Sequence, residues 1–421
     1  MVYHIGTPFL FYMEKIKVKK LKNGSKLIDV VISGVPYVVI SVWLPFGSNQ
    51  DPVEKQGMAH LLEHLYMSRN RKFKTEVEYL KYLESNSISF NAFTSTEWMV
   101  FYFIMPAAAM QSAAKIFLDT FYDPGFGEED LKKQRQVVLN ESLENESDTS
   151  NYLFRLMSRA FFKDPAMHKD FYGTEKTLSA IMLKDIKEYR KKMFTDSNVS
   201  FMVISPNGVP AETERIFAAH SFDSGSALER PVPEFASKDV VQYKKQDNTS
   251  ARMVCRFPSL GDVPGMAIGN FIRDYLGNSW SSALISELRI NKGIVYWVDT
   301  HTEYFPEYGF LSIGFSCENK DLPTVKKEIG LALARLSRVL LKPGMVKHFT
   351  EMYVFKTQCK QADPLHNLYW FGTDIVFGNP AVTHEAYYKA ARAITPRAVR
   401  NFAKKYLQPE HMAWITINNK K

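Results

Sequence analysis

The fold is decided by a stretch of sequence that occurs twice, as LKDIKEYRKKMFTDSNVSFMVIS (residues 183–205) and as TPRAVRNFAKKYLQPEHMAWITIN (residues 395–418). At a constant offset of 213 residues, the aligned positions share their chemistry: Ile186 with Val399, Tyr189 with Phe402, and Phe201 with Trp414. Each copy is typical of an amphipathic helix, a short turn and an alternating strand. A coincidental helix-to-strand pattern is the alternative. Otherwise the chain consists of two halves built to one plan.

A weaker similarity, at an offset of 210, aligns AHLLEHL (residues 59–65) with GNFIRDYL (residues 269–276). In this alignment only the first half has kept its histidines. Residues 206–233 are enriched in Pro, Gly, Ser and Glu and show little periodicity, which is typical of a connecting segment. We therefore place a domain boundary near residue 225 and expect two domains, residues 1–225 and residues 226–421.

Hydrophobic periodicity predicts the same order of elements in both halves. For the first half we expect a strand at 38–45, helices at 56–68 and 74–84, and a strand-rich segment at 90–105. For the second half we expect a strand at 252–257, helices at 267–276 and 281–289, and a pair of strands at 294–302 and 309–317. Each half is therefore predicted to be α+β.

Composition and charge exclude several classes of protein. Of the 421 residues, 45% are hydrophobic and 23% charged, as in an ordinary globular protein. The longest apolar run, residues 98–110, is too short to span a membrane. In the first dozen residues, MVYHIGTPFLFY, the apolar stretch precedes the lysines, so we expect no export signal. The net charge of +8 comes from Lys and Arg spread along the chain, a pattern that does not indicate nucleic-acid binding.

The three cysteines are Cys255, Cys317 and Cys359. Their odd number and wide spacing fit neither a disulfide framework nor a thiolate metal site. We therefore expect a cytoplasmic protein.

The most specific signal for function is His60-Leu61-Leu62-Glu63-His64, within the helix predicted over residues 56–68. At about 100° per residue, positions 60, 63 and 64 face the same side of a helix. The chain's own frequencies of His and acidic residues predict only about 0.03 chance occurrences of this pattern. It is the inverted form of the helical zinc motif. Two histidines held by hydrogen bonds on a half-buried helix face are the alternative.

The residue types of this motif suit zinc chemistry. Two neutral imidazoles bind zinc, a third protein ligand completes the site, and the fourth position is left to a water whose pKa the metal lowers. Glu63 would take the proton from that zinc-bound water and return it to a leaving amine. The acidic helix predicted over residues 128–144 supplies candidates for the third ligand. Among them, Glu141 follows an apolar run and can point inward, whereas Glu144 is typical of a solvated face.

The motif HLLEH, followed after 76 intervening residues by Glu141 in RQVVLNE, closely resembles the M16 metallopeptidases, the group of pitrilysin, insulinase and the mitochondrial processing peptidase. The resemblance covers nearly the whole chain from LKNGSKL (residues 21–27) onward. It includes NAFTSTEWMVFY (residues 91–102), FYGTEKTLSAI (residues 171–181) and GNSWSSALISELRINKGIVYWV (residues 277–298).

The resemblance implies a zinc-dependent endopeptidase that hydrolyses short or unfolded peptides. One Zn²⁺ per chain would be held by His60, His64 and Glu141. The implied fold has two similar α+β domains that arose by internal duplication, each a mostly antiparallel sheet flanked by helices. Leader or targeting peptides and general peptide debris are the candidate substrates.

The resemblance also assigns roles outside the metal motif. Asn91, Ala92 and Phe93 would form a substrate-binding edge strand, and Arg289 and Tyr296 would contact the scissile peptide. Residues 1–225 would then be the zinc-binding catalytic domain, and residues 226–421 the homologous domain that supplies Arg289 and Tyr296. From the residues alone, an ordinary internal strand and a purely structural Arg and Tyr remain the alternatives.

One position departs from the family pattern. The family usually has a second glutamate seven positions before the metal ligand, and this sequence has Gln134 there. An amide can orient Glu141 by hydrogen bonding but adds no negative charge, so we expect weaker zinc binding.

Short chains of this family form homodimers, in which each chain has both halves of the site, or heterodimers, in which each chain keeps one half. This chain has both halves, which favours a homodimer; a heterodimer with a related chain is the alternative. The competing function is that of a non-catalytic or partner subunit, which the intact HLLEH motif disfavours.

Overall fold

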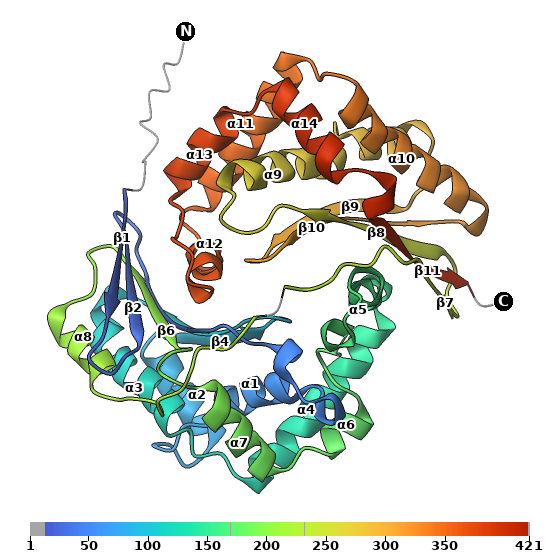
Figure 1. Ribbon diagram of the computed structural model, residues 1–421. Coiled ribbons are helices and arrows are strands. Elements are labelled where there is room, and N and C mark those ends of the chain that lie inside the picture. Colours follow the sequence, from blue (N-terminus) through green and yellow to red (C-terminus); the bar gives the residue numbers. More distant parts are fainter. Residues whose placement is uncertain (1–12, 169, 231, 420–421) are drawn as a thin grey trace.

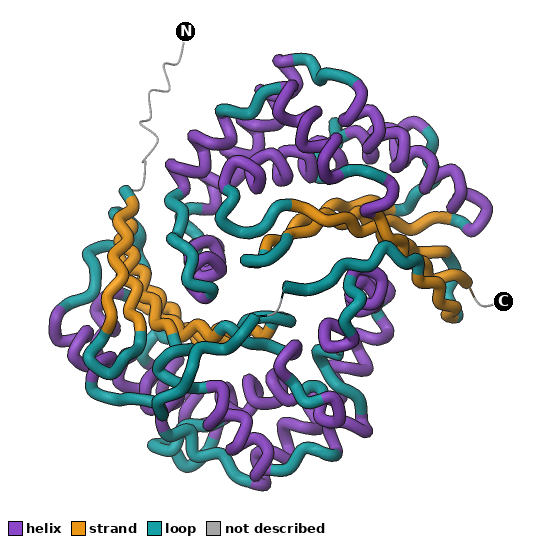
Figure 2. The backbone as a smooth tube through the Cα atoms, viewed as in Figure 1, coloured by secondary structure: helices purple, strands orange, loops and turns teal. Residues whose placement is uncertain are grey.

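The computed structural model describes residues 13–168, 170–230 and 232–419. Two β-sheets lie across the middle of the molecule, and most helices cover their outer sides (Figures 1 and 2). The N-terminal dozen, for which we expect no export signal, lies outside the described residues.

The first sheet has six strands in the order β1-β2-β6-β3-β5-β4. Its strands are β1 (Glu14–Lys20), β2 (Lys26–Ile32), β3 (Val38–Leu44), β4 (Ser89–Thr94), β5 (Met99–Met105) and β6 (Ser200–Ser205). The pair β2 and β6 is parallel, whereas the other neighbours are antiparallel. Among the described strands β4 pairs with β5 alone, so the other side of β4 is a free edge.

The second sheet repeats five of these six positions, in the order β7-β11-β8-β10-β9. Its strands are β7 (Val240–Lys244), β8 (Thr249–Phe257), β9 (Trp297–Tyr304), β10 (Gly309–Cys317) and β11 (Met412–Asn419). β7 pairs in parallel with β11, as β2 does with β6. The order therefore matches β2-β6-β3-β5-β4, and β9 occupies the edge position that β4 has in the first sheet.

The repeated stretch forms the same unit twice. Helices α7 (Leu183–Met193) and α14 (Pro396–Tyr406) begin 213 residues apart (396 − 183) and end 213 residues apart (406 − 193). Each leads into a strand inside its sheet, β6 or β11. The predicted internal duplication and the two α+β halves are confirmed, whereas the boundary near residue 225 stays a prediction.

Helices cover the outer side of each sheet (Figure 1). Those of the first half are α1 (Met58–Ser68), α2 (Glu76–Ser85), α3 (Met110–Tyr122), α4 (Glu128–Ser147), α6 (Glu175–Ser179), α7 and α8 (Ala211–Ala218). Those of the second half are α9 (Val263–Gly277), α10 (Leu322–Arg338), α11 (Pro343–Lys360), α13 (His384–Arg392) and α14. Among the described residues, no helix combines the length and the apolar character needed to cross a membrane.

Two of the predicted elements near residue 290 differ from the structure. The helix expected at 281–289 is instead a π-helical segment at Ile285–Asn291. The strand expected from residue 294 begins only at Trp297. The physical reason is that the N–H of Ile294 donates to the C=O of Leu288 (3.0 Å), so residue 294 caps the end of the helix instead of pairing in the sheet.

Each half contributes one helix to the sheet of the other half. Helix α5 (Thr149–Phe161), from the first half, packs on β8 and β11, and α12 (Pro364–Val376), from the second half, packs on β3 and β6 (Figure 1). Apolar residues of both helices and both sheets belong to one buried cluster, which includes Trp43, Leu156, Phe371 and Ile415. Neither half can therefore bury the inner face of its sheet without the other.

The tightest approach in this shared core is between α12 and β3. A Cβ atom at Gly372 would overlap the indole ring of Trp43, which is fully buried. The ring is held in place by a hydrogen bond from its Nε1 to Ser41 Oγ (3.2 Å) and by Trp98, whose ring centroid is 5.2 Å away. Close approach thus requires glycine here, although glycine costs a helix about 1 kcal/mol relative to alanine.

We expect Gly372→Ala to lower the free energy of unfolding by about 1–3 kcal/mol, because the added methyl group overpacks the core and displaces Trp43. Gly330→Ala is the matched control, since Gly330 is exposed on α10 and a Cβ there would meet nothing within 4 Å. The control should raise the free energy of unfolding by about 0.5–1 kcal/mol. Urea denaturation measures both values, and equal effects would show that α12 does not depend on this contact.

Candidate metal centre

Helix α1 begins on a buried carboxylate. The side chain of Asp51 accepts hydrogen bonds from the backbone N–H groups of Gly57 (2.8 Å), Met58 (3.0 Å) and Ala59 (3.0 Å). The hydroxyl of Tyr189 also donates to Asp51 (3.2 Å). These bonds satisfy free N–H groups of the first turn and place a negative charge at the positive end of the helix dipole. The start of α1, whose first turn contains His60, is therefore fixed by side chains from outside the helix.

Three side chains converge on one point between α1 and α4. His60 Nε2 and His64 Nε2 are 3.2 Å apart, and Glu141 Oε2 lies 3.6 Å from the first and 3.5 Å from the second. Among the described residues, these three form the one group of at least three His, Cys, Asp or Glu side chains suited to hold a metal ion. The structure thus brings together the residues for which the sequence predicted zinc binding.

The spacing of the donor atoms fits a zinc ion. In a tetrahedral site with bonds of about 2.1 Å, neighbouring ligand atoms are about 3.4 Å apart, close to the three separations observed here. Two imidazole nitrogens and one carboxylate oxygen also form a donor set typical of catalytic zinc. Burial, and secondly the nearby His64, lower the pKa of His60 to about 3, so its imidazole is neutral, as a metal ligand must be.

Glu63 lies beside this cluster and is buried. The hydroxyl of Thr94, the last residue of β4, donates a hydrogen bond to the Glu63 carboxylate. Burial raises the pKa of Glu63 to about 7; the charge of Glu141 adds to this rise, while the bond from Thr94 opposes it. A carboxyl group with such a pKa can both accept and return a proton near neutral pH.

Gln134 lies two turns before Glu141 on α4 and is buried. Among the described residues, its side chain makes no hydrogen bond to Glu141, His60 or His64. The predicted effect of this amide on zinc affinity stays a prediction.

A cavity of 490 Å³ opens beside the cluster, lined by His60, Glu63 and Glu141 on one side. Residues of both halves complete it, because α5 and the β9–β10 hairpin also contribute side chains. Its wall is mainly aromatic, formed by Phe93, Phe154, Phe161, Phe162, Phe171, Tyr172, Phe305, Tyr308 and Phe310. Its other polar side chains include Asn145, Asn151, Arg155 and Glu303. The cavity can therefore receive an apolar side chain close to the metal cluster.

Strand β4 carries Asn91, Ala92 and Phe93 at the free edge of the first sheet. The alternative of an internal strand is therefore wrong. Phe93 is 47% exposed and lines the cavity, so the edge lies next to the metal cluster. An extended peptide can pair with the outer side of β4 if it displaces the side chain of Asn91, whose Oδ1 accepts a hydrogen bond from the N–H of Ala92 (2.8 Å).

Arg289 and Tyr296 lie elsewhere. Arg289 is in the π-helical segment Ile285–Asn291, with its guanidinium over the ring of Trp280 (5.3 Å), and Tyr296 immediately precedes β9. Neither is among the described residues that line the cavity beside His60. Tyr296 is 54% exposed and Trp280 70% exposed, so both side chains face outward.

Sequence reasoning from the residues missed Thr94 and Tyr172 as parts of the site. Tyr172 lies edge-on to His60, with ring centroids 5.2 Å apart, in a loop whose Gly173 packs against the backbone of Gln56. The segments NAFTSTEWMVFY and FYGTEKTLSAI contain these residues, but periodicity does not reveal that they meet α1.

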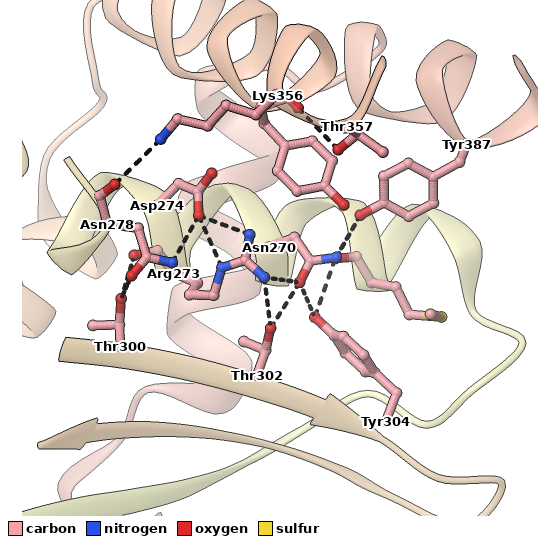
Figure 3. A network of polar contacts seen from close by, with 12 residues as sticks. Asn270, Arg273, Asp274, Asn278, Thr300, Thr302, Tyr304, Lys356, Thr357 and Tyr387 are labelled. Carbon is pink, nitrogen blue, oxygen red and sulfur yellow. Dashed lines mark hydrogen bonds and ion pairs between the residues drawn. The ribbon is translucent and has the colours of Figure 1, made fainter. Parts of the chain in front are cut away.

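In the second half, the place that corresponds to the metal cluster contains polar side chains that form hydrogen bonds and an ion pair with one another (Figure 3). Helix α9 carries Asn270, Arg273 and Asp274 at the positions that correspond to the HLLEH motif. Arg273 pairs with Asp274 (2.7 Å), while Asn270 accepts from Thr302 (2.7 Å) and donates to Tyr387 (2.6 Å). The polar groups of this network are hydrogen-bonded or ion-paired with one another, so they do not form a group of donors suited to a metal ion.

Comparison with protein families gives two adjacent matches. Residues 33–175 match the model of insulinase, peptidase family M16, and residues 180–339 match the model of the peptidase M16 inactive domain. Together these matches cover well over half of the chain.

Individual relatives agree with the family matches. An uncharacterized zinc protease of Bacillus subtilis is 26% identical over 328 residues, covering 77% of this chain and 79% of the relative. The beta subunit of the mitochondrial-processing peptidase of Rattus norvegicus is 21% identical over 314 residues, covering 71% of this chain and 63% of that subunit. The crystal structure of a protease from Helicobacter pylori superposes with a TM-score of 0.86 at 18% identity, over 97% of this chain and 100% of the other. This structural match shows the shared fold.

We expect Asp51→Asn to lower the free energy of unfolding by about 1–3 kcal/mol, because one carboxylate oxygen that accepts hydrogen bonds becomes an NH₂ group that faces other donors. Asp262→Asn is the matched control: Asp262 caps α9 through a single bond from Gly265 N–H (3.0 Å), which an amide oxygen also accepts. The control should change the stability by less than about 0.5 kcal/mol. Thermal or urea denaturation compares the two, and a neutral Asp51→Asn would contradict the assigned role of Asp51.

Proposed function

The chain belongs to peptidase family M16, and from this premise we propose that it is a zinc-dependent endopeptidase that cleaves short or unfolded peptides. The observation that carries the proposal is the convergence of His60, His64 and Glu141 on one point, with the buried Glu63 beside it. Relatives that are named zinc proteases support the same chemistry.

His60, His64 and Glu141 would hold one zinc ion per chain. When bound, zinc supplies Lewis acidity, which lowers the pKa of water and polarises a carbonyl oxygen. The protein contributes a buried, neutral imidazole in His60 and a carboxylate on a long helix, so the donor atoms are positioned before the ion arrives.

Glu63 would act as the general base and then as the general acid. Its carboxylate takes a proton from the water that attacks the peptide carbonyl carbon, and it returns that proton to the amine as the C–N bond breaks. The raised pKa of about 7 supports both steps, because the group can change its protonation state near neutral pH. The hydrogen bond from Thr94 would hold the carboxylate in place during the reaction.

The substrate would bind as an added strand on β4. Main-chain hydrogen bonds to the edge at Asn91, Ala92 and Phe93 provide affinity without a demand for one sequence. The aromatic cavity beside Phe93 would receive one substrate side chain. An extended backbone is required for this binding mode, so a folded protein must unfold locally before cleavage.

Arg289 and Tyr296 would reach the scissile peptide from a second copy of the chain. Their absence from the lining of the cavity beside His60, together with the exposure of Tyr296, Trp280 and Ile290, supports completion of the site across a homodimer. In that arrangement the Tyr296 hydroxyl would stabilise the developing oxyanion, and Arg289 would hold the substrate.

The cytoplasmic location expected from the cysteines stays a prediction.

We expect Glu63→Gln to lower kcat by at least about 10²-fold while the zinc content stays at one ion per chain, since Glu63 is a base and not a ligand. Glu144→Gln, an exposed position on the same helix as Glu141, should leave both values unchanged. The measurements are cleavage of an unstructured peptide mixture and metal analysis of reconstituted protein. If fully zinc-loaded wild-type protein cleaves no peptide, the non-catalytic subunit is the better explanation.

Mixing two inactive variants tests the shared site. In a 1:1 mixture of Glu63→Gln and Tyr296→Phe chains, about half of the dimers contain one chain of each kind, and one of their two sites is intact. We therefore expect recovery of about one quarter of the wild-type activity after subunit exchange. Tyr296→Phe alone should lower kcat by about 10²-fold if the hydroxyl stabilises an oxyanion. A mixture no more active than the mean of its components would contradict a site shared between chains.

A further inference from the structure

A buried ion-pair cluster joins the two halves near the catalytic cavity. Arg230, in the connecting segment, pairs with Glu97 and with Glu307 (2.9 Å). Glu97 lies in the turn between β4 and β5, and Glu307 lies in the turn between β9 and β10. The hydroxyl of Tyr308 donates a further hydrogen bond to Glu97. One guanidinium therefore connects the tips of two hairpins, one from each sheet.

The environment makes this connection costly to break. The side chain of Arg230 is 17% exposed and that of Glu97 4% exposed, and the guanidinium lies over the ring of Phe377 at 4.0 Å. Burial raises the pKa of Glu97, while Arg230 and the bond from Tyr308 oppose this rise and favour the charged form. Without Arg230, two carboxyl groups would face each other with no cation between them.

The β4–β5 hairpin, whose turn contains Glu97, also carries parts of the proposed catalytic site. Thr94, three residues before Glu97, donates to Glu63. Backbone oxygens of Ser95 and Thr96 accept from Ser48 N–H (3.2 Å) and Asn49 N–H (2.9 Å), in the loop that leads to α1. A displacement of this turn would therefore move the edge strand, the partner of Glu63 and the approach to the metal helix together.

The β9–β10 hairpin, whose turn contains Glu307, also lies beside the proposed catalytic site. Phe305 and Tyr308, on either side of Glu307 in sequence, both line the cavity beside Glu63. The backbone N–H of Phe305 donates to the C=O of Tyr308 (2.6 Å), which closes the turn. The cluster thus holds one wall of the cavity, from the second half, against the edge strand of the first half.

We propose that Arg230 is a positioning residue for peptide cleavage: by clamping the β4–β5 turn to the β9–β10 turn, it fixes the substrate strand and the Thr94–Glu63 pair relative to the cavity wall. The inference rests on the proposed peptidase function. Among the described residues, Arg230 belongs neither to the metal cluster nor to the lining of the cavity, so it acts through the two turns.

Steady-state kinetics and hydrogen exchange of the full chain test this role. Arg230→Met should lower kcat by about 10-fold or more with the zinc content unchanged, because small displacements of catalytic groups are costly. Arg392→Met is the matched control: Arg392 forms an exposed ion pair with Glu351 (3.1 Å) between α13 and α11 and should leave kcat and KM unchanged.

Two conservative variants separate positioning from loss of folding. Arg230→Lys keeps the charge and should restore part of kcat relative to Arg230→Met. Tyr308→Phe removes one hydrogen bond and keeps both ion pairs, so we expect a loss of about 3-fold in kcat. Loss of activity in Arg230→Met that only follows a smaller folded fraction, with normal kcat per folded zinc-loaded chain in all three variants, would overturn the proposal.

Hydrogen exchange gives a readout that does not depend on catalysis. Arg230→Met should speed amide exchange in both turns, residues 94–99 and 304–309, and leave α10 unchanged. Faster exchange confined to the connecting segment, or spread evenly over the molecule, would overturn the clamp. If the wild-type protein cleaves no peptide, the proposed function fails, and the exchange data still decide whether Arg230 holds the two turns together.

Discussion

The exchange of helices between the halves is the constraint on which the rest of the structure depends. Because α5 covers the second sheet and α12 covers the first, the inner faces of both sheets share one apolar core. The contact between Gly372 and Trp43 shows how closely this core is packed, since even a methyl group does not fit. The cavity beside the metal cluster follows from the same arrangement: α5 supplies Phe154 and Phe161 to its wall, and the second half supplies Phe310.

The duplicated halves use equivalent positions in two physical ways. In the first half, two imidazoles and a carboxylate converge with few hydrogen bonds among themselves, and burial keeps His60 neutral. Such a group gains stability from a divalent cation, which compensates the negative charge of Glu141 and of the buried Glu63 beside it. In the second half, the permanent positive charge of Arg273 is paired with Asp274, and Asn270 accepts a hydrogen bond from Thr302, so no cation is needed there. The same fold therefore supports a face suited to hold a metal ion in one copy and a polar core contact in the other.

The side chains that α1 contributes to the candidate site are held mainly by contacts from outside that helix. Asp51 fixes the start of α1, and Thr94 holds Glu63 from the end of β4. Thr94 belongs to the hairpin whose tip is clamped by Arg230. A chain of polar contacts thus links the first turn of the metal helix to the connection between the halves. Such contacts are strong because they are buried and few of their atoms have water as an alternative partner.

The sequence by itself determined the features that depend on local spacing. Residues 60, 63 and 64 share a helix face because the helical period is local, and the 213-residue repeat of helix and strand is visible because both copies keep the same periodicity. Tertiary structure alone decided that Glu141 meets the histidines, that β4 is an edge rather than an internal strand, and that Arg289 and Tyr296 lie away from the cavity of their own chain. It also decided the exchange of α5 and α12 and the clamp at Arg230. These features depend on contacts between segments far apart in the chain, and such contacts are set by the packing of whole helices and sheets rather than by the pattern within any one of them.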